Sequence, residues 1–520
     1  MTEWLKHDPL PLSPLDADNQ ALLDHVHPEN WRNPAPRPLY HLVVIGGGTA
    51  GLVSAAIGAA LGASVALVER RALGGDCLNI GCVPSKALIR AARAAAAART
   101  AGEFGVRTGD IGVDFAAVMA RMRKLRRELS ATDSAARFKS LGVDVFLGDS
   151  RFTGPDTIEI SGSILRFRRA VIASGGRPVL PALPGLAEAR PLTNETIFNL
   201  TALPRRLAVI GAGPIGCELA QSFRRFGAEV TMLTDGKRML PREDDAAAAL
   251  LAAQFQREGI TVITSARLTS VESAAGKILH YEKDGAARQL AADEILVAIG
   301  RAPNVEGLQL EKAGVVHDRA GVTVDDGLRT SNPRIYAAGD ICSVYKFTHA
   351  ADAMARIAVR NALFPFLPAQ KFSRVVMPWC TYTEPEIAHA GASARDLETK
   401  KIAHETIEVP FAEVDRAKLD GETGGLLKLR VSPHGRILGA TLVAAHAGEM
   451  IGELTLAISR KIPLGDLASV IHPYPTQAEA IRKAGDLWNR RRLTPGRQRL
   501  LARILRWVHG APGRGSARVE

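Results

Sequence analysis

Two cysteines in a short glycine-rich segment are the residues whose types and spacing most clearly suggest chemistry. Cys77 and Cys82 lie within Gly74–Lys86, which leads into an alanine-rich helical run, and the 520 residues contain only five cysteines. Two thiols with four residues between them can form a redox disulfide, a structural bridge or half of a metal site. A sparse, odd number of cysteines argues against a secreted disulfide framework and favours a catalytic pair.

Length and composition indicate a multidomain α/β protein. A chain of 520 residues is too long for one core, so we expect about three domains. The 48 glycines and 46% hydrophobic residues are typical of a soluble α/β protein with many strand-to-helix turns. No segment resembles a signal peptide or offers about 20 uncharged apolar residues for a membrane span, so we expect a cytoplasmic protein.

The formal net charge of +12 is concentrated at the end of the chain. Residues 481–520 contain eleven lysines and arginines against two acidic residues, so the rest of the chain is close to neutral. A basic tail of this kind says little about the globular part, and we expect no nucleic-acid partner.

The first of two dinucleotide-binding patterns follows a strand predicted for His41–Ile45. A G-x-G-x-x-G motif joins this strand to a helix, and an acidic residue ends the next strand, 18 positions after the last glycine. The candidate residues are Gly46, Gly48, Gly51 and Glu69. A lone motif is weak, but here the whole dinucleotide-binding context is present. The glycines allow a tight turn and close approach to a pyrophosphate, and the acid would bind a ribose.

A second pattern with the same organisation begins at the strand predicted for Arg206–Ile210. Its glycines are Gly211, Gly213 and Gly216, and a helix and the strand Ala228–Leu233 follow. Two complete patterns in one chain predict two bound dinucleotides.

The end of the second pattern bears on the choice between NADPH and NADH. Thr234 stands where an acid would bind a 2′-hydroxyl, and Asp235, Lys237 and Arg238 follow. The missing acid and the nearby cations favour the 2′-phosphate of NADPH. NADH is the alternative, because Asp235 could supply the acid after a shift of one residue.

Three further strands, within residues 170–178, 294–303 and 330–340, end in small residues suited to a nearby cofactor. Their candidate positions are Gly175, Gly300, Gly339 and Asp340. Ligands bind at the carboxyl ends of strands in an open α/β sheet. The alternatives are plain strand-to-loop exits and, for Asp340, a cap on the following helix.

The two ends of the chain differ from this central region. Residues 1–38 are rich in proline and polar residues, and we expect an extended lead that packs on the surface or frays. Residues 240–300 are expected to alternate short strands. From about Phe372, strands at 425–430 and 437–443 and helices at 448–460 and 476–490 predict a separate α+β domain with an antiparallel sheet.

With both fingerprints, the cysteine loop and the Gly339-Asp340 strand end in this order, residues 40–490 resemble a pyridine nucleotide-disulfide oxidoreductase. That class includes glutathione reductase, dihydrolipoamide dehydrogenase and mercuric reductase. The segment Cys77-Leu-Asn-Ile-Gly-Cys82-Val-Pro-Ser-Lys86 matches the family's redox loop almost letter for letter.

The resemblance implies an α/β fold with two Rossmann-like dinucleotide-binding domains, for FAD and NAD(P), and a C-terminal α+β dimerisation domain. It implies a homodimer whose subunits share the active site. The expected division is an N-terminal extension at 1–39, a FAD-binding domain at 40–190 and 301–370, a NAD(P)-binding domain at 191–300, a dimerisation domain at 371–490 and a basic tail at 491–520.

The resemblance also implies cofactor and catalytic roles. FAD would bind at the first fingerprint and Asp340, and the nicotinamide cofactor at the second fingerprint. Gly75, Gly175, Gly300 and Gly339 are further cofactor-binding candidates. Cys82 as a thiolate would lie against the flavin, and Cys77 would attack the substrate. Lys86, paired with Glu218, would stabilise negative charge on the reduced flavin. The alternative for Glu218 is an ordinary acid on a helix face.

The segment Ile471–Glu479 departs from the pattern of the disulfide reductases. That class places an acid–base histidine directly before a Pro-Thr pair, with a glutamate about four residues later. Here Tyr474 takes that position and Glu479 follows, whereas His472 lies two residues earlier as a substitute or a structural residue. An interface tyrosine resembles mercuric reductase, and a phenol with a pKa of about 10 is a poor base at neutral pH.

We therefore expect a mercuric reductase-like flavoenzyme that passes electrons from NAD(P)H through FAD and the cysteine pair to a small acceptor, which is a disulfide, a metal ion or a quinone. The last cysteine is Cys380, so the C-terminal cysteine pair of mercuric reductases is missing, and we expect no resident metal site. The alternatives are a disulfide reductase of the dihydrolipoamide dehydrogenase or glutathione reductase type and a low-turnover, membrane-docked redox sensor.

The basic tail itself has a helical pattern. Arg497–Val508 carries apolar residues at helical spacing with arginines between them. Such a helix suits an anionic membrane surface, and a helix that docks on its own protein is the alternative.

Overall fold

The computed structural model describes residues 10–273 and 276–510. Contacts divide the protein into two compact units, which we call the first unit and the second unit. The first comprises Met1–Glu243, Leu251–Val375 and Thr381–Thr383, and the second comprises Asp244–Leu250, Val376–Cys380 and Glu384–Glu520. Within the described ranges, no helix has the length and apolar character needed to cross a membrane.

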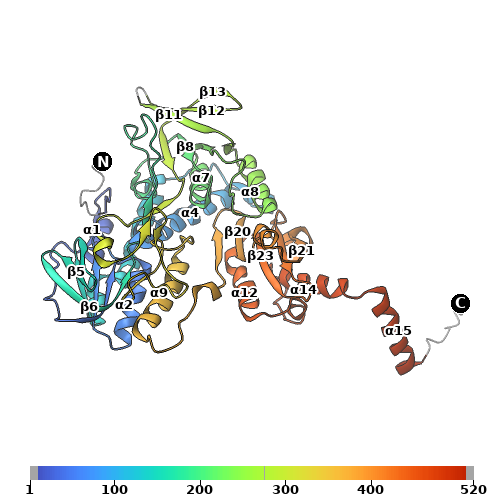
Figure 1. The fold of residues 1–520 in the computed structure, drawn as a ribbon. Helices are drawn as coiled ribbons and strands as arrows, with labels where there is room; N and C mark the ends of the chain where they lie inside the picture. The colour runs from blue at the N-terminus through green and yellow to red at the C-terminus, as the bar shows by residue number, and fades with distance from the viewer. Residues whose placement is uncertain (1–9, 274–275, 511–520) are drawn as a thin grey trace, which may run out of the picture. The chain divides into compact units, whose positions relative to one another are not determined.

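The first unit contains a mixed seven-stranded sheet (Figure 1). Its order is β3-β2-β1-β6-β5-β4, and β18 also pairs with β6. The strands are β1 (Tyr40–Ile45), β2 (Val65–Glu69), β3 (Val143–Leu147), β4 (Ser150–Gly154), β5 (Thr157–Ile160), β6 (Ser163–Ile172) and β18 (Ile335–Ala337). β1, β2, β3, β6 and β18 pair in parallel, and β4 and β5 extend β6 antiparallel. All of β2 is buried, as expected for a parallel strand covered on both faces.

Helices α2 (Thr49–Ala60) and α9 (Thr348–Leu363) pack against each other and against strands of this sheet. Gly339 follows β18 with a φ of +85°, and a Cβ there would lie 3.4 Å from Ala50 of α2 and from Ala351 of α9. The two helices therefore meet at the strand end where a ligand was expected. The remaining helices of this part are α3 (Gly75–Asn79), α4 (Cys82–Thr100), α5 (Phe115–Ser130) and α6 (Ala135–Ser140).

The first unit contains a second parallel sheet in the order β10-β9-β8-β14. Its strands are β8 (Arg206–Ile210), β9 (Glu229–Leu233), β10 (Thr261–Ile263) and β14 (Glu294–Val297). Helix α7 (Pro214–Phe226) connects β8 to β9 and begins with a proline, whose missing N–H costs nothing at that position. Smaller antiparallel elements are β7 (Gly176–Pro178) with β15 (Arg301–Pro303), β11 (Arg267–Ser273) with β12 (Lys277–Lys283) and β13 (Ala286–Ala292), and β16 (His317–Asp318) with β17 (Gly321–Val322).

One expectation for this region is wrong. Residues 240–300 were predicted to alternate short strands, but α8 (Asp245–Arg257) is a helix of 13 residues. The physical reason is its run of alanines and leucines, which are the strongest helix formers.

The second unit contains a sheet in the order β19-β20-β23-β22-β21. Its strands are β19 (Pro378–Thr381), β20 (Glu386–Gly391), β21 (Glu405–Pro410), β22 (Leu426–Val431) and β23 (Ile437–Ala444). Pairs β20–β23, β22–β23 and β21–β22 are antiparallel, which confirms the α+β prediction for this region. The helices are α10 (Ala394–Thr399), α11 (Asp415–Leu419), α12 (Ala447–Arg460), α13 (Leu464–Leu467), α14 (Glu479–Arg491) and α15 (Pro495–His509).

The N-terminal segment corrects another expectation. Instead of an extended lead, it forms α1 (Ala17–Val26), whose N-cap Asp16 accepts from the Asn19 N–H at 2.9 Å. Leu22 and Val26 are fully buried in the core of the first sheet. The apolar stripe of this helix is too short to show as a periodic pattern, because it has only three turns and a polar residue, Asn19, occupies its inner face.

Candidate active site

The two cysteines flank the junction between α3 and α4. Cys77 lies in α3, Cys82 is the first residue of α4, and both are free thiols. A hydrogen bond from the Cys77 thiol lowers the pKa of Cys82 to about 6 and raises the pKa of Cys77. The Thr348 Oγ1, at the start of α9, lies 3.3 Å from the Cys82 Sγ and lowers its pKa further. Cys82 is therefore the thiol that carries negative charge near neutral pH.

An ion pair lies about one helical turn beyond Cys82. The Lys86 Nζ lies 2.7 Å from the Glu218 Oε2 of α7. The other carboxylate oxygen of Glu218 accepts from the Tyr382 N–H at 2.9 Å, and the Lys86 ammonium lies 4.5 Å from the centroid of the Tyr382 ring. These contacts hold the ammonium at one position on α4, close to the thiols.

Aromatic packing between helices sets up this pair. α4 packs against both α5 and α7. The ring of Phe115 in α5 lies with its centroid 5.8 Å from those of Phe223 and Phe226 in α7. Edge and tilted ring contacts of this kind favour one register of the helices. The rings thus fix α7, which carries Glu218, against α5, and α4 with Lys86 packs on both helices.

The first fingerprint forms a tight cradle between β1 and α2. A Cβ on Gly46 would lie 2.3 Å from the Ala173 carbonyl oxygen, and one on Gly51 would lie 1.7 Å from the Gly46 carbonyl oxygen. Gly48 caps α2, and a Cβ on Gly75 would lie 2.6 Å from the Gly48 Cα. Only glycine fits at positions 46, 51 and 75, whereas a Cβ on Gly48 would lie at an ordinary 3.6 Å from the Gly75 Cα. The amides at the start of α2 suit a pyrophosphate, and the contact with Gly75 brings the redox loop beside them.

Glu69, the last residue of β2, accepts hydrogen bonds from the loop after β1 and from the loop after β2. Its Oε2 accepts from the Gly47 N–H at 2.5 Å, and its Oε1 accepts from the N–H groups of Arg71 and Ala72 at 2.6 and 3.2 Å. The carboxylate therefore has three backbone donors. Its contact with a ribose stays a prediction.

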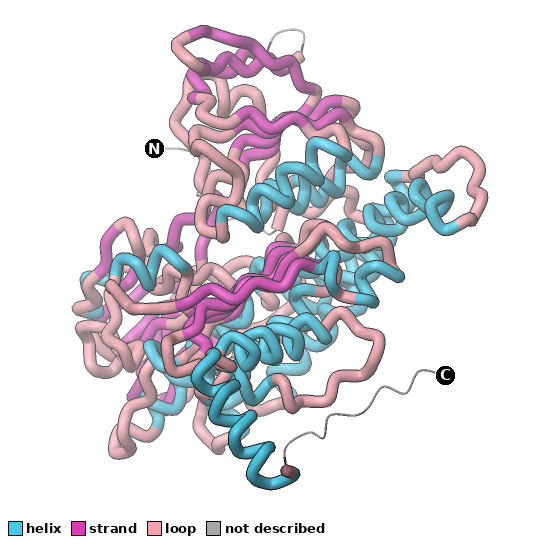
Figure 2. Tube along the Cα trace, turned by 90° about the vertical axis from the view of Figure 1, so that its right-hand side faces the viewer, coloured by secondary structure: helices cyan, strands magenta, loops and turns pink. Residues whose placement is uncertain are grey.

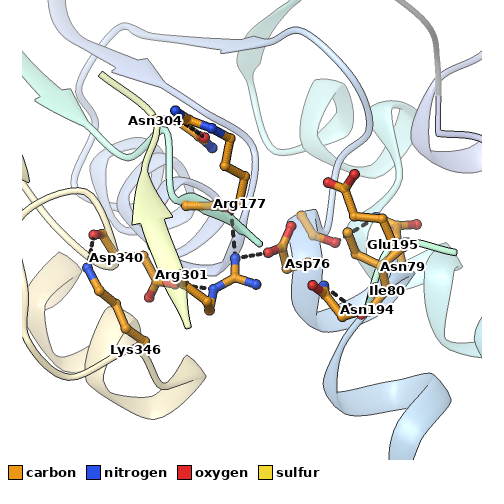
Figure 3. Close-up of polar contacts among 12 residues, drawn as sticks. Asp76, Asn79, Ile80, Arg177, Asn194, Glu195, Arg301, Asn304, Asp340 and Lys346 are labelled. Carbon is orange, nitrogen blue, oxygen red and sulfur yellow. Dashed lines mark hydrogen bonds and ion pairs between the residues drawn. The ribbon is translucent and has the colours of Figure 1, made fainter. Parts of the chain in front are cut away.

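Asp340 pairs with an arginine that the sequence analysis had not singled out. Figure 3 shows Arg301 between the carboxylates of Asp340 and Asp76, and its Nε lies 3.1 Å from the Asp340 Oδ2. Burial raises the pKa of Asp76, and the Arg301 charge opposes this shift. Because Asp76 belongs to α3, the arginine links the end of β18 to the helix that contains Cys77. Asp340 does not cap the next helix, because the N-cap of α9 is Phe347.

The segments that follow the candidate residues Gly175 and Gly300 pair with each other. β7 and β15 form a two-stranded antiparallel sheet. Beside it, the Asn304 N–H donates to the Gly175 carbonyl at 3.0 Å, and the Val179 N–H donates to the Gly300 carbonyl at 3.1 Å. Gly175 and Gly300 have φ values of +70° and +143°, where glycine is favoured. Both glycines therefore belong to the connection between the two nucleotide-binding sheets.

The second fingerprint repeats the geometry of the first. A Cβ on Gly211 would lie 2.5 Å from the Ala298 carbonyl oxygen, and one on Gly216 would lie 2.4 Å from the Gly211 carbonyl oxygen. Gly213 caps α7, and a Cβ there would have no atom within 4 Å. The packing of the protein itself does not require glycine at position 213. A ligand phosphate that approaches the amides would require it.

The cations after β9 have different surroundings. The Arg238 guanidinium donates to the backbone carbonyls of Leu240, Pro241 and Glu243 at 2.9 to 3.3 Å. Lys237 is exposed. Arg238 therefore holds the following loop, and Lys237 is the exposed one of the two cations.

The expected acid–base residues lie in the second unit and line one pocket of ≈ 320 Å³. The His472 Nε2 lies 3.1 Å from the Glu453 Oε2, and its Nδ1 lies 3.1 Å from the Val470 carbonyl oxygen. The Tyr474 hydroxyl donates to the Asp415 Oδ2 at 3.1 Å. The histidine and the tyrosine therefore have separate partners on different helices.

These partners influence what each group can do. The Asp415 carboxylate raises the pKa of the Tyr474 phenol, which makes it a hydrogen-bond donor rather than a base near neutral pH. Glu479 is buried and its Oε1 lies 2.7 Å from Arg482, while its Oε2 has no hydrogen-bond partner within the described chain. The glutamate next to His472 is thus Glu453 of α12, not Glu479.

Three partners of the expected residues were missed by sequence reasoning: Thr348, Arg301 and Glu453. Only Arg301 carries a sequence signal, because it directly follows Gly300 in a strand exit. Thr348 is 266 residues from Cys82 and Glu453 is 19 from His472, and no local spacing connects them. Among residues 10–273 and 276–510, no group of three or more His, Cys, Asp or Glu side chains could hold a metal ion.

Two family models match this chain. The model described as pyridine nucleotide-disulphide oxidoreductase matches residues 40–355, and the one described as the dimerisation domain of the same family matches residues 377–485. These matches confirm the predicted family and the fold class of two nucleotide-binding regions with a dimerisation domain.

Relatives of two kinds are similar over most of the chain. A mercuric reductase of Bacillus cereus is 35% identical over 448 residues, which are 86% of this chain and 71% of the relative. A dihydrolipoyl dehydrogenase of Mycoplasma pneumoniae is 32% identical over 453 residues, 85% of this chain and 97% of the relative.

Solved structures show the same fold. The HOCl-induced flavoprotein disulfide reductase RclA from Escherichia coli has a TM-score of 0.76 and 27% identity, and the match covers 86% of this chain and 100% of RclA. LpdA from Mycobacterium tuberculosis has a TM-score of 0.77 and 29% identity over 87% of this chain and 99% of LpdA.

Proposed function

Because this chain belongs to the pyridine nucleotide-disulphide oxidoreductase family, we propose that Cys77 and Cys82 pass electrons from NADPH to a small acceptor. The family uses FAD and a pyridine nucleotide, and the dimerisation domain supports a homodimer. The observation that carries the proposal is the geometry of the thiol site. The pKa of Cys82 is lowered to about 6, and the ammonium of Lys86 is held nearby by Glu218.

The residues proposed to hold FAD surround the redox helix. They are Gly46, Gly48, Gly51, Glu69, Gly75, Gly175, Gly339 and Asp340. The support is the cradle into which no Cβ fits at Gly46 and Gly51, and the contact of Gly48 with Gly75. When bound, FAD takes a hydride from the nicotinamide and delivers two electrons to the disulfide.

The side chains of this protein would manage the thiols and the charge. Reduction of the Cys77–Cys82 disulfide to a Cys77 thiol and a Cys82 thiolate takes two electrons and one proton, which together equal the hydride, so no further proton is needed. Cys82 would hold the negative charge, with hydrogen bonds from Cys77 and Thr348. Lys86, held by Glu218, would stabilise negative charge on the reduced cofactor. Cys77 would attack the acceptor, which gains two electrons as the disulfide forms again.

The second fingerprint would bind the nicotinamide cofactor through Gly211, Gly213, Gly216 and Gly300, and we propose NADPH over NADH. Thr234 offers no carboxylate to a ribose, and Lys237 is exposed beside it. Asp235 is also exposed and is the residue that would favour NADH. The ratio of kcat/KM for the two cofactors tests the preference.

The acceptor side would use Tyr474. In a homodimer with a shared active site, its hydroxyl would lie beside the acceptor as a hydrogen-bond donor or ligand. The imidazole of His472 is already bonded on both nitrogens, to Glu453 and the Val470 carbonyl, so we assign it a positioning role. Glu479 pairs with Arg482 and would hold the pocket wall.

The experiment that tests the function is steady-state NADPH oxidation with a panel of acceptors: Hg²⁺, Cu²⁺, glutathione disulfide, lipoamide and quinones. Relatives named mercuric reductase and dihydrolipoyl dehydrogenase, and a Cu(II) complex of RclA, motivate the panel. Turnover above the oxygen background that is lost in Cys77→Ser supports the proposal. Flavin reduction by NADPH without turnover of any acceptor would favour the alternative, a low-turnover redox sensor.

The C-terminal helix supports a further proposal, contact with an anionic lipid surface. α15 has no buried residue, and Figures 1 and 2 show it extending beyond the other helices of the second unit. Its exposed apolar side chains are Leu500, Leu501, Ile504, Leu505, Trp507 and Val508. Its charged side chains, Arg497, Arg499, Arg503 and Arg506, are all cationic at neutral pH. This composition is typical of helices that lie in a lipid headgroup region.

A further inference from the structure

We propose that the N-terminal segment of residues 10–31 positions the redox helix α3, and that Asn19 and Arg126 are the positioning residues. The inference rests on the proposed redox role of Cys77 and Cys82. It assigns a function to a segment that lies outside the residues matched by the family models, which begin at residue 40.

The guanidinium of Arg126, on α5, lies between α1 and α3. Its Nη2 donates to the Asn19 Oδ1 at 2.6 Å, and its Nη1 donates to the Asn79 carbonyl oxygen at 2.7 Å. The three residues are 1%, 0% and 1% exposed for Arg126, Asn19 and Asn79. Asn79 is the last residue of α3, two positions after Cys77. One buried side chain thus joins the N-terminal helix to the end of the redox helix.

This contact is sensitive to substitution because the charge of Arg126 is buried. None of the described hydrogen bonds of Arg126 goes to a carboxylate, and its Nε is buried without a hydrogen-bond partner in the described chain. Burial lowers the pKa of Arg126 to about 10. Two oxygens, one from Asn19 and one from Asn79, therefore provide most of its solvation. Loss of either oxygen would leave a buried N–H group of the guanidinium without a partner, so the side chain would shift.

The same segment also contacts the chain before the cysteine. The Leu73 N–H donates to the Val26 carbonyl at 3.0 Å, and Leu22 and Val26 lie in the hydrophobic cluster that contains Leu73 and Leu78. The N-terminal segment thus holds the redox loop on both sides of Cys77, at residues 73 and 79.

Ion pairs anchor α1 to α5 and so hold Asn19 in place. The Arg123 Nε lies 2.5 Å from the Asp16 Oδ2, and the Arg127 Nε lies 2.6 Å from the Asp18 Oδ1. The Asn19 Nδ2 donates to the Pro14 carbonyl at 2.7 Å, which sets the direction of its amide. The Asn19 oxygen is therefore presented to Arg126 in one orientation.

The test compares three variants in the purified holoenzyme: Asn19→Leu, which removes the acceptor; Asn19→Asp, which keeps an acceptor; and the control Asp24→Asn, an exposed residue of the same helix that accepts a hydrogen bond from Gln20. The first readout is the alkylation rate of Cys77 in the reduced protein, measured by peptide mapping. The second is the amplitude of the long-wavelength thiolate–flavin absorbance per bound flavin. The melting temperature is measured in parallel.

Asn19→Leu is expected to raise the alkylation rate of Cys77 about fivefold and to lower the absorbance amplitude, because Arg126, which bonds the end of α3 at Asn79, loses its buried hydrogen bond to Asn19. Asn19→Asp and Asp24→Asn are expected to stay within about twofold of the natural protein in both readouts. A lower melting temperature of Asn19→Leu with natural alkylation and absorbance would reduce the segment to a structural brace and overturn the inference.

A second variant keeps the test decisive if Asn19→Leu does not fold. Arg126→Lys retains the charge, but an ammonium does not span two acceptors in a fork, so it should raise Cys77 alkylation in the same way. Natural alkylation in that variant would also overturn the inference. Absence of the long-wavelength absorbance in the natural protein would count against the proposed role of Cys82, whereas the alkylation comparison would still test the segment.

Discussion

The Lys86 Nζ and the Glu218 Oε2 lie 2.7 Å apart, although 132 residues separate them in the chain. The lysine belongs to the helix that starts at Cys82, and the glutamate belongs to the helix of the second fingerprint. One ion pair thus joins the thiol site to the helix of the second fingerprint. The two side chains differ in exposure, 37% for Lys86 and 6% for Glu218, so their loss has different consequences.

Lys86→Met should destabilise the protein by about 1–3 kcal/mol, because it leaves the buried carboxylate of Glu218 with only one backbone donor. Glu218→Gln should cost less, since the freed ammonium reaches water and the amide oxygen can still accept from Tyr382. Urea unfolding measures both. The control is Lys124→Met, which removes an exposed pair with Glu128 and should change stability by less than about 1 kcal/mol. Equal losses for Lys86→Met and the control would contradict the buried pair.

Thr348→Val should raise the pKa of Cys82 from about 6 by up to about one unit, because the thiolate loses a hydrogen-bond donor and one unit corresponds to ~1.4 kcal/mol. A pH titration of the long-wavelength absorbance in the reduced enzyme measures the midpoint. The pKa of Cys82 is lower in the folded than in the unfolded protein, so its ionisation stabilises the fold as pH rises from about 6 to about 9, and this contribution is lost as pH falls through 6. An unchanged midpoint would remove Thr348 from the site.

Gly213→Ala should raise the KM for the nicotinamide cofactor about tenfold or more without a change in melting temperature, because the added methyl group has no protein atom within 4 Å but lies where a phosphate approaches. Gly216→Ala should lower stability as well, since its Cβ would lie 2.4 Å from the Gly211 oxygen. Gly102→Ala, also in open space, serves as the control. A natural KM in Gly213→Ala would place the cofactor elsewhere.

Tyr474→Phe should slow acceptor reduction about tenfold or more while flavin reduction by NADPH keeps its natural rate, because the hydroxyl acts only on the acceptor side. Stopped-flow measurement of the two half-reactions separates these effects. The Asp415 carboxylate raises the Tyr474 pKa, so the acceptor half-reaction should show no phenol ionisation below about pH 10. Asp415→Asn should shift that ionisation to lower pH. Slower flavin reduction in Tyr474→Phe would refute this division of roles.

Removal of residues 494–520 should abolish co-sedimentation with anionic vesicles and leave NADPH oxidation intact, because this segment holds the exposed apolar residues and arginines of α15. Binding of the full chain should weaken as salt is raised and should be much lower with zwitterionic vesicles. Binding that survives the deletion would locate the lipid contact elsewhere. No vesicle binding by the full chain would favour α15 as a contact between protein surfaces.

Much of the fold was predictable because its signals are local. Within each fingerprint, the strand, the glycines after it and the next helix lie within about 30 residues of chain. The first begins at residues 41–45 and the second at residues 206–210, and their backbone conformations depend on neighbours in sequence. The helix α15 was predictable for the same reason. Helix α1 was not, since its burial depends on α5 and on the loop at residue 73 rather than on a pattern of its own.

The sequence by itself determined the family, the two nucleotide-binding motifs and the cysteine pair, because residue type and short spacing are sufficient for tight turns and for a dithiol loop. Only the tertiary structure decided which side chains serve them. Thr348 lies beside Cys82. Arg301 joins Asp76 to Asp340. The carboxylate that contacts His472 belongs to Glu453 and not to Glu479. Such pairs come from distant helices and strands, and packing of the cores, rather than spacing along the chain, sets the distances between them.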